Sequence, residues 1–299
     1  MIRRTGKPNR TRSRKPGRRF GRFSFAVTML LLVGIAVLVL LSFPDGRRLI
    51  DGALTAGLRI DRQVRLQMGL ALRGTPDLAR FNERLSAKGM ASGAPVFIRI
   101  FKKESELELW MKKGDSFALF ANYPICRWSG RLGPKLKEGD RQSPEGFYTV
   151  SSGQLNPNSR YHRSFNLGFP NGLDKAHGRT GSYLMVHGGC GSIGCYAMTN
   201  PVIDEIWHLV TAALKGGQPR FHVHVYPFRM TSWNMMVHGD GEWGDFWRDL
   251  KQGHDLFERA QVPPAISFCS GRYVAREGKP GSRGSHPIGK NCTVQLSKN

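Results

Sequence analysis

The hydrophobic residues of the chain follow three successive patterns. Residues 23–43 form an unbroken apolar run rich in Leu, Val, Ile and Ala. Residues 44–93 carry a helix signal, in which Thr75 and Pro76 precede apolar residues at helical spacing. From about residue 95 the period changes to two, which is typical of strands. We therefore expect an apolar helix, a helical stalk over 44–93, and a β-rich domain over 94–275.

Short alternating runs predict the strands of this domain. Polar turns join the first three runs, which favours a β-meander. A polar stretch over 151–175 predicts a loop. The six predicted strands are 96–101, 106–110, 116–120, 147–150, 183–186 and 220–226.

Two helices and a tail complete the pattern. Asn200 and Pro201 begin an amphipathic helix that Gly216 ends. Apolar residues from Trp243 to Leu250 predict one face of a second helix, with a wall over a substrate cleft as the alternative role. The Gly/Ser/Lys-rich segment 276–299 predicts a flexible tail. The fold class is thus mainly β with helices (α+β).

Charge is concentrated at one end of the chain. The net charge of +23 first suggests a nucleic-acid-binding protein, and a hydrophobic content of 40% excludes wholesale disorder. Residues 1–22 hold ten basic residues and no acid, 23–43 hold no charge, and the remainder carries +13. Because the basic segment has no interleaved aromatic motif and adjoins an apolar helix, we expect it to meet lipid headgroups and not nucleic acid.

The apolar run is long enough to cross a membrane. A helix of 21 residues, at ~1.5 Å per residue, matches a hydrocarbon core of ~30 Å. The basic flank predicts a single-pass inner-membrane anchor with a cytoplasmic N-terminus and a periplasmic catalytic domain. A cleaved signal peptide is the alternative, but residues 44–48 offer no small-residue cleavage site. Arg18 and Arg19 are a weaker sign of a twin-arginine signal.

All five cysteines lie in the part of the chain that we expect to be exported. Cysteines pair in an oxidising compartment, and an odd number leaves at least one free thiol unless an intermolecular bond forms. We expect Cys190 to be buried or disulfide-bonded, with a redox partnership to Cys195 as the alternative. The sequence leaves the pairing open among Cys126, Cys190, Cys269 and Cys292.

The densest chemistry lies in residues 187–198. A cysteine thiolate is a strong nucleophile, and a nearby imidazole lowers the thiol pKa by ion pairing. Cys195 also precedes a predicted helix, whose dipole favours a thiolate. We predict Cys195 as nucleophile and His187 as base, with a backbone carbonyl or Ser192 orienting the imidazole. The turn that supplies oxyanion donors consists of Gly188, Gly189, Ser192, Gly194 and the Cys195 N–H.

These residues resemble a known family. Ser-Ile-Gly-Cys at 192–195 resembles the S-x-G-C signature of YkuD-type L,D-transpeptidases, and Val-His-Gly at 186–188 resembles their histidine motif. Residues 139–148 resemble the strand-entry motif of the same domain. Three further segments are similar to the YafK-like branch of the family, namely 132–135, 156–161 and 167–171. The resemblance covers about 95–275 and implies a β-sandwich-like catalytic domain.

The resemblance implies acyl transfer on peptidoglycan stem peptides without a cofactor or metal. Cys195 would attack the carbonyl at the L-centre of meso-diaminopimelate, expel D-alanine and form a thioester. An amine acceptor would give a cross-link. Water as acceptor would make the enzyme a hydrolytic amidase, and the YafK-like branch is associated with releasing an outer-membrane lipoprotein from peptidoglycan. A non-catalytic peptidoglycan-binding module is the third alternative.

The chain departs from the wider family in two ways. Only seven residues separate His187 from Cys195, and Tyr196-Ala197-Met198 stands where an arginine often follows the cysteine. Another cation would then hold the substrate carboxylate, for which the arginine fork is well suited. The substrate-binding candidates are Arg160, Arg163, Arg179, Lys135 and Tyr196.

The other histidines are candidates for metal binding or substrate contact. His222 and His224 share one face of a predicted strand, and with the site they would suggest zinc. Their regular alternation with apolar residues favours an ordinary strand, so we predict no metal. His162 and His177 lie before the site as secondary candidates for substrate contact.

Overall fold

The computed structural model describes residues 19–293, with side chains from Phe25 onward. Most of the predicted basic tail, 1–22, and the last residues of the predicted flexible tail lie outside the described residues. The chain divides into two compact units, one up to Gly52 and one from Ala53.

The first unit consists of helix α1 (Arg19–Ser42) and the beginning of α2 (Pro44–Gln67). Within α1, Phe25–Ser42 has a mean hydropathy of 2.8, and none of this stretch is buried. By length and composition α1 could therefore cross a membrane. Pro44 stands at the first position of α2, where its fixed φ and missing N–H are tolerated.

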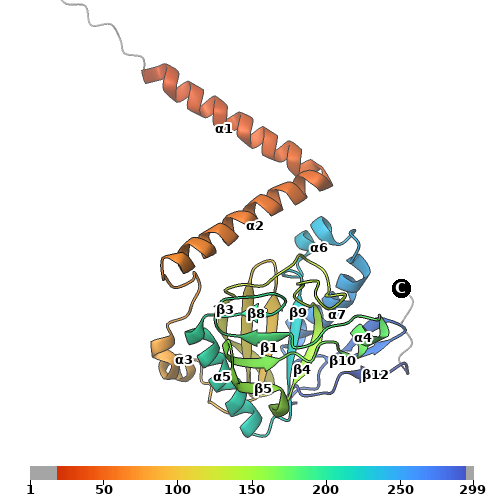
Figure 1. The fold of residues 1–299 in the computed structure, drawn as a ribbon. Helices are drawn as coiled ribbons and strands as arrows, with labels where there is room; N and C mark the ends of the chain where they lie inside the picture. Colours follow the sequence, from red (N-terminus) through yellow and green to blue (C-terminus); the bar gives the residue numbers. More distant parts are fainter. Residues whose placement is uncertain (1–18, 294–299) are drawn as a thin grey trace, which may run out of the picture. The chain divides into compact units, whose positions relative to one another are not determined.

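A five-stranded sheet, here sheet A, forms the centre of the second unit in the order β3-β2-β1-β9-β4 (Figure 1). Its antiparallel β1–β2–β3 meander confirms the sequence prediction, and β9 lies parallel to β1. Every residue of β1 and β9 is buried. The strands are β1 (Val96–Phe101), β2 (Glu106–Lys113), β3 (Ser116–Pro124), β4 (Gly146–Val150) and β9 (Phe221–Tyr226).

A four-stranded sheet, here sheet B, has the order β5-β6-β7-β8. The prediction of a loop at 151–175 is wrong, because this segment contains β5, β6 and most of the short helix α4. The hairpin reads as polar because β5 is a solvent-exposed edge strand. The elements are η2 (Ser152–Gln154), β5 (Leu155–Ser159), β6 (His162–Asn166), α4 (Gly172–Ala176), β7 (Met185–His187) and β8 (Tyr196–Ala197).

A third sheet lies near the C-terminus, with β10 (Ala265–Cys269) between β11 (Arg272–Arg276) and β12 (Gly289–Lys290). A disulfide joins Cys269 to Cys292. The prediction of a flexible tail from 276 is therefore wrong for its described part, because a strand pairing and a covalent bond fasten that segment to β10.

Helices pack around the sheets (Figure 1). One large apolar cluster joins sheet A, sheet B and the buried face of α5, and it includes Ile98, Val186 and Ile203. Trp247 of α7 belongs to a second buried cluster, which agrees with a core role for that helix face. The remaining helices are η1 (Leu78–Arg80), α3 (Phe81–Ala87), α5 (Asn200–Lys215), α6 (Ser232–His238) and α7 (Gly244–Ala260).

Candidate active site

Sheet B brings the chain segments of His187 and Cys195 side by side. Strand β7 ends at His187 and pairs in parallel with β8, so that His187 lies opposite Ala197. Cys195 directly precedes β8, and its sulfur accepts a hydrogen bond from the N–H of Met185, the first residue of β7. Cys195 therefore lies beside the strand that ends at His187.

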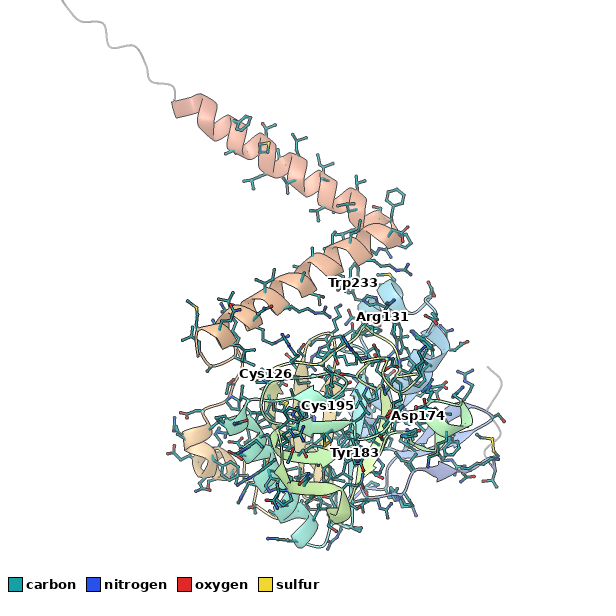
Figure 2. All side chains as sticks on the ribbon, viewed as in Figure 1. Cys126, Arg131, Asp174, Tyr183, Cys195 and Trp233 are labelled. Carbon is teal, nitrogen blue, oxygen red and sulfur yellow. A yellow bond between two sulfur atoms is a disulfide. The ribbon has the colours of Figure 1, made fainter. Side chains whose placement is uncertain are left out.

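Cys195 is the free cysteine of the described chain. Its sulfur accepts a hydrogen bond from the Met185 N–H at 3.4 Å and donates to the Tyr183 carbonyl at 3.6 Å (Figure 2). Burial raises the pKa of the Cys195 thiol, and the Met185 N–H and the charge of Lys135 oppose this shift only in part. The thiol is therefore neutral at neutral pH.

His187 is almost completely buried. Its Nδ1–H donates to the Gly188 carbonyl at 2.5 Å, which leaves Nε2 with a lone pair to act as base. Burial lowers the pKa of His187, and the Gly188 carbonyl opposes this shift. The ring of Tyr161 packs against the imidazole at 4.9 Å between centroids.

Burial therefore favours the neutral forms of both the Cys195 thiol and the His187 imidazole, because it raises the pKa of the first and lowers the pKa of the second. The pKa shifts of Cys195 and His187 both oppose the thiolate–imidazolium pair expected from sequence, because burial disfavours both charged forms. Among the described contacts, no hydrogen bond joins the Cys195 sulfur to His187. The orienting group is a backbone carbonyl, since the Ser192 hydroxyl donates elsewhere.

The carbonyl of Cys195 is doubly hydrogen-bonded. It accepts from the Ser192 hydroxyl at 2.7 Å and from the Ser143 hydroxyl at 3.1 Å. The Cys195 N–H, by contrast, donates to none of the described residues. The Gly194 N–H reaches only the Ser192 hydroxyl, at 3.3 Å. The Cys195 N–H is therefore an open donor for a developing oxyanion.

The helix-dipole argument for Cys195 is wrong. Strand β8, Met198 and Thr199 lie between Cys195 and the beginning of α5 at Asn200. A helix dipole acts mainly within its first turn, so α5 does not stabilise a thiolate at Cys195.

A disulfide between Cys126 and Cys190 fastens the loop that connects His187 to Cys195. Cys126 follows β3, and its N–H donates to the Ala197 carbonyl. Cys190 is therefore disulfide-bonded as expected, and its partner is Cys126 and not the nearby Cys195. Cys126 follows β3 of sheet A, and Cys190 lies in the loop after β7 of sheet B.

Two loop glycines serve packing against α5. The Gly189 N–H donates to the Asn200 side chain at 2.8 Å. A Cβ at Gly188 would lie 2.6 Å from the same Asn200 oxygen, so a larger residue would displace the loop. The structure therefore shows contacts of Gly188 and Gly189 with Asn200 of α5.

The substrate-binding candidates differ sharply in availability. Arg179 is buried and bonds Asp174 at 2.8 Å, and the Tyr196 hydroxyl is buried against the Pro144 carbonyl. Because these buried contacts use the polar groups of both side chains, neither residue is available to substrate. Lys135 is also buried and pairs with Asp140.

Of the two remaining arginines, Arg160 lies in the turn before β6 and Arg163 lies within β6. Arg163 lies 3.2 Å from Asp204. Arg160 is exposed, and its side chain contacts no described residue in an ion pair or hydrogen bond. It directly precedes Tyr161, whose ring packs on His187. Among the predicted candidates, Arg160 is therefore the cation whose side chain the described contacts leave unpaired.

The other histidines are held in structural contacts. On β9, Nδ1 of His222 lies 3.2 Å from Nε2 of His224, and the Nε2–H of His222 donates to the His286 carbonyl. His162 bonds Asp204, and His177 bonds the Gly271 carbonyl. Within residues 19–293 no group of three or more His, Cys, Asp or Glu side chains is placed to hold a metal ion.

Sequence reasoning missed four contributors to the site. Ser143 lies inside the 139–148 motif, which was the available signal for it. Asn200 was recognised only as a helix start. Tyr161 lies in the 156–161 segment and Tyr183 begins the predicted strand 183–186, but neither pattern indicated the ring contact of Tyr161 with His187 or the contact of the Tyr183 carbonyl with Cys195.

Two comparisons match this chain to known proteins. The family described as the L,D-transpeptidase catalytic domain, YkuD, matches residues 95–246. YafK of Escherichia coli (strain K12), which is classed by name with the L,D-transpeptidases, is 54% identical over 187 residues, covering 62% of this chain and 76% of YafK.

Solved structures give weaker similarity. The helical cell shape determining protein Pgp2 from Campylobacter jejuni is 19% identical, with a TM-score of 0.36 over 60% of this chain and 67% of Pgp2. Bd1075 of Bdellovibrio bacteriovorus is also 19% identical, with a TM-score of 0.32 over 55% of this chain and 60% of its own. The family match and the identity to YafK carry the assignment: this chain belongs to the YkuD family of L,D-transpeptidase catalytic domains.

Proposed function

We propose that the protein is a cysteine-dependent acyltransferase acting on peptidoglycan stem peptides in cell-wall remodelling. The observation that carries the proposal is the free thiol of Cys195, which is hydrogen-bonded to Met185 in the strand that ends at the buried His187. Membership in the L,D-transpeptidase family supports the same chemistry.

The first half-reaction forms a thioester. The S–H of Cys195 turns from the Tyr183 carbonyl toward His187, and its proton passes to Nε2 as sulfur bonds the carbonyl carbon at the L-centre of diaminopimelate. The Cys195 N–H receives the oxyanion. The C–N bond to D-alanine then breaks, and the imidazolium proton passes to the leaving amine.

The second half-reaction resolves the thioester. An acceptor amine attacks the thioester carbonyl while His187 takes its proton, the C–S bond breaks, and the sulfur of Cys195 recovers a proton. The products are a new amide and the free enzyme. Water in place of the amine gives a carboxylic acid, which is the amidase alternative.

Arg160 is the proposed carboxylate-binding residue. It combines an exposed guanidinium with a position next to Tyr161, which contacts the base. A planar guanidinium binds both oxygens of a carboxylate, and the stem peptide presents free carboxyl groups. The other cations among the candidates are paired with Asp174, Asp140 or Asp204.

The proposed location is the periplasm, with α1 as a single-pass inner-membrane anchor. The apolar stretch Phe25–Ser42 and the two disulfides both fit this location, because disulfides persist in oxidising compartments. Protease added to intact spheroplasts should degrade the domain. A domain that stays protected would contradict this orientation.

The test of function uses diaminopimelate-containing tetrapeptide muropeptides. We expect the purified protein to give a thioester adduct on Cys195 and D-alanine release, measured by mass spectrometry. Cross-linked dimers would indicate an amine acceptor, and trimmed monomers would indicate water. Absence of both adduct and product would favour the non-catalytic module. Equal product from Cys195→Ala would contradict the assigned nucleophile.

A further inference from the structure

Ser143 is a buried polar residue outside the catalytic loop, and all its hydrogen-bonding groups are used. Its N–H donates to the Ser129 carbonyl at 2.9 Å, and its hydroxyl oxygen accepts from the Ser129 N–H at 3.1 Å. The hydroxyl itself donates to the Cys195 carbonyl. Ser143 therefore links a distant segment of the chain to the peptide unit that follows the nucleophile.

A buried ammonium group fixes the segment that carries Ser143. Lys102, at the end of β1, is fully buried and donates to the carbonyls of Arg131, Gly133 and Ser143 at 2.9–3.0 Å. It also bonds the Glu145 carboxylate at 2.9 Å. Because an unpaired buried charge is costly, these contacts hold the 131–145 segment to sheet A in one arrangement.

Glu145 extends this arrangement to a third element. Its carboxylate also accepts from the Gly133 N–H at 2.7 Å and from the indole N–H of Trp247 at 2.8 Å. Sheet A, α7 and the 131–145 segment therefore meet around one buried ion pair. Ser143 lies two residues from Glu145, so its hydroxyl has little freedom to move.

Ser143 and Ser192 differ as donors to the Cys195 carbonyl. Ser192 lies three residues before Cys195, so its hydrogen bond to the Cys195 carbonyl stays within the turn, and its hydroxyl also lies 3.3 Å from the Ser129 hydroxyl. Ser143 comes from 52 residues away and ties that turn to the rest of the domain. The tie acts on the backbone of Cys195, whose sulfur attacks and whose N–H receives the oxyanion.

We infer that Ser143 is a positioning residue. Its hydroxyl holds the Cys195 turn so that the sulfur and the N–H of Cys195 both reach the substrate carbonyl in the geometry that the reaction needs. This inference rests on the proposed function. Ser143 has no contact with His187 and is buried, so it should affect the chemical step without binding substrate. Misplacement of a nucleophile by a fraction of an ångström to 1 Å costs on the order of ten- to a hundredfold in rate.

The test compares Ser143→Thr with Ser143→Val, because these side chains have the same shape and differ in the hydroxyl. We expect the threonine variant to keep kcat within about threefold of the natural protein and the valine variant to lose about tenfold or more, with KM unchanged. Substrate is the tetrapeptide muropeptide. Equal activity of the two variants, whether high or low, would overturn the inference.

A second measurement separates positioning from loosening of the fold. The rate of Cys195 alkylation by iodoacetamide reports exposure and ionisation of the thiol, and the other cysteines are in disulfides. Positioning leaves this rate unchanged in Ser143→Val, whereas a loosened loop would raise it and overturn the inference. Should the valine variant fail to fold, Ser143→Ala replaces it under the same criteria.

Ser105→Ala is the matched control. Ser105 is a buried serine beside the same lysine, and its hydroxyl bonds the Lys102 carbonyl and the Trp128 indole but not Cys195. It should retain full kcat, and a loss equal to that of Ser143→Val would overturn the inference. If the natural protein itself gives no Cys195-dependent product, the proposed function fails and the inference falls with it.

Discussion

Sheets A and B are ordered by different forces. The central strands of sheet A, β1 and β9, have six residues each, all buried, and five consecutive residue pairs join them. In sheet B the catalytic strands β7 and β8 have three and two residues. So short a ladder supplies few backbone hydrogen bonds, and other contacts must fix the site.

Those other contacts are local cross-links. The Cys126–Cys190 disulfide fastens the loop, hydroxyls of Ser143 and Ser192 fix the Cys195 carbonyl, and Gly188 orients the imidazole. We therefore expect sheet A to provide most of the stability and sheet B to hold the residues of the proposed chemistry. The comparison predicts that activity and stability can be lost separately.

Replacing the nucleophile should give the largest loss of activity with the smallest loss of stability. We expect Cys195→Ala to lower turnover of the tetrapeptide muropeptide by about 10⁴-fold or more and to leave the melting temperature nearly unchanged, because the thiol makes only long hydrogen bonds. Steady-state assay and thermal melting measure the two effects. A large fall in melting temperature would show that the site contributes to stability.

A core substitution in sheet A should have the reverse effect. Ile98 is completely buried in β1, and Ile98→Ala should reduce the free energy of unfolding by about 2–5 kcal/mol. The rate per folded molecule should stay the same at 25 °C. Urea denaturation gives the first quantity and active-site titration the second. If the rate per folded molecule fell as far as the stability, the two sheets would not differ in their roles.

The two disulfides provide a matched pair. Each double serine variant should lose about 2–4 kcal/mol of stability, but only Cys126→Ser with Cys190→Ser should also lower kcat, because only that bond fastens the catalytic loop. Cys269→Ser with Cys292→Ser is the control. Equal kcat in both variants would mean that the remaining contacts suffice to hold the loop.

Arg160→Gln should raise KM about tenfold with little change in kcat, because an exposed charge-assisted contact to substrate is worth roughly 1.4 kcal/mol. Arg276→Gln, an exposed arginine on β11, is the control. Steady-state kinetics with the tetrapeptide muropeptide measure KM and kcat of both variants. Unchanged KM for Arg160→Gln would remove Arg160 from the proposed site.

The smallest effect concerns pH. Burial lowers the pKa of His187, so the neutral base persists below the ordinary histidine value of about 6.5, and activity should be lost only as pH falls through that lowered pKa. Burial raises the pKa of Cys195, so the neutral thiol persists to higher pH than in a free cysteine. A kcat/KM profile with its acid limb above pH 6.5 would contradict a neutral resting pair.

The sequence predicted what depends on local pattern. Period-two apolar runs predicted the meander over 96–120, and the motifs at 186–188 and 192–195 pointed to the family that the comparisons show. The hairpin of β5 and β6 escaped prediction because an exposed edge strand needs no apolar alternation. Its polar composition reads as a loop until its partner strand is known.

Long-range contacts were beyond prediction for a different reason. The pairing of Cys126 with Cys190 depends on how β3 lies against β8, and the availability of Arg160 depends on which carboxylates reach the other cations. Burial likewise reversed the expected ionisation of His187 and Cys195. Local sequence does not encode these distances; the packing of the sheets sets them.

The Cys126–Cys190 bond also bears on how the protein matures. Cys190 is five residues from Cys195 and 64 from Cys126, and loop-closure entropy favours encounter with the nearer thiol while the chain is unfolded. An early bond to Cys195 would consume the nucleophile. Newly made chains must therefore bring β3 beside β8 before oxidation is complete, which makes the order of folding and oxidation a condition for obtaining active enzyme.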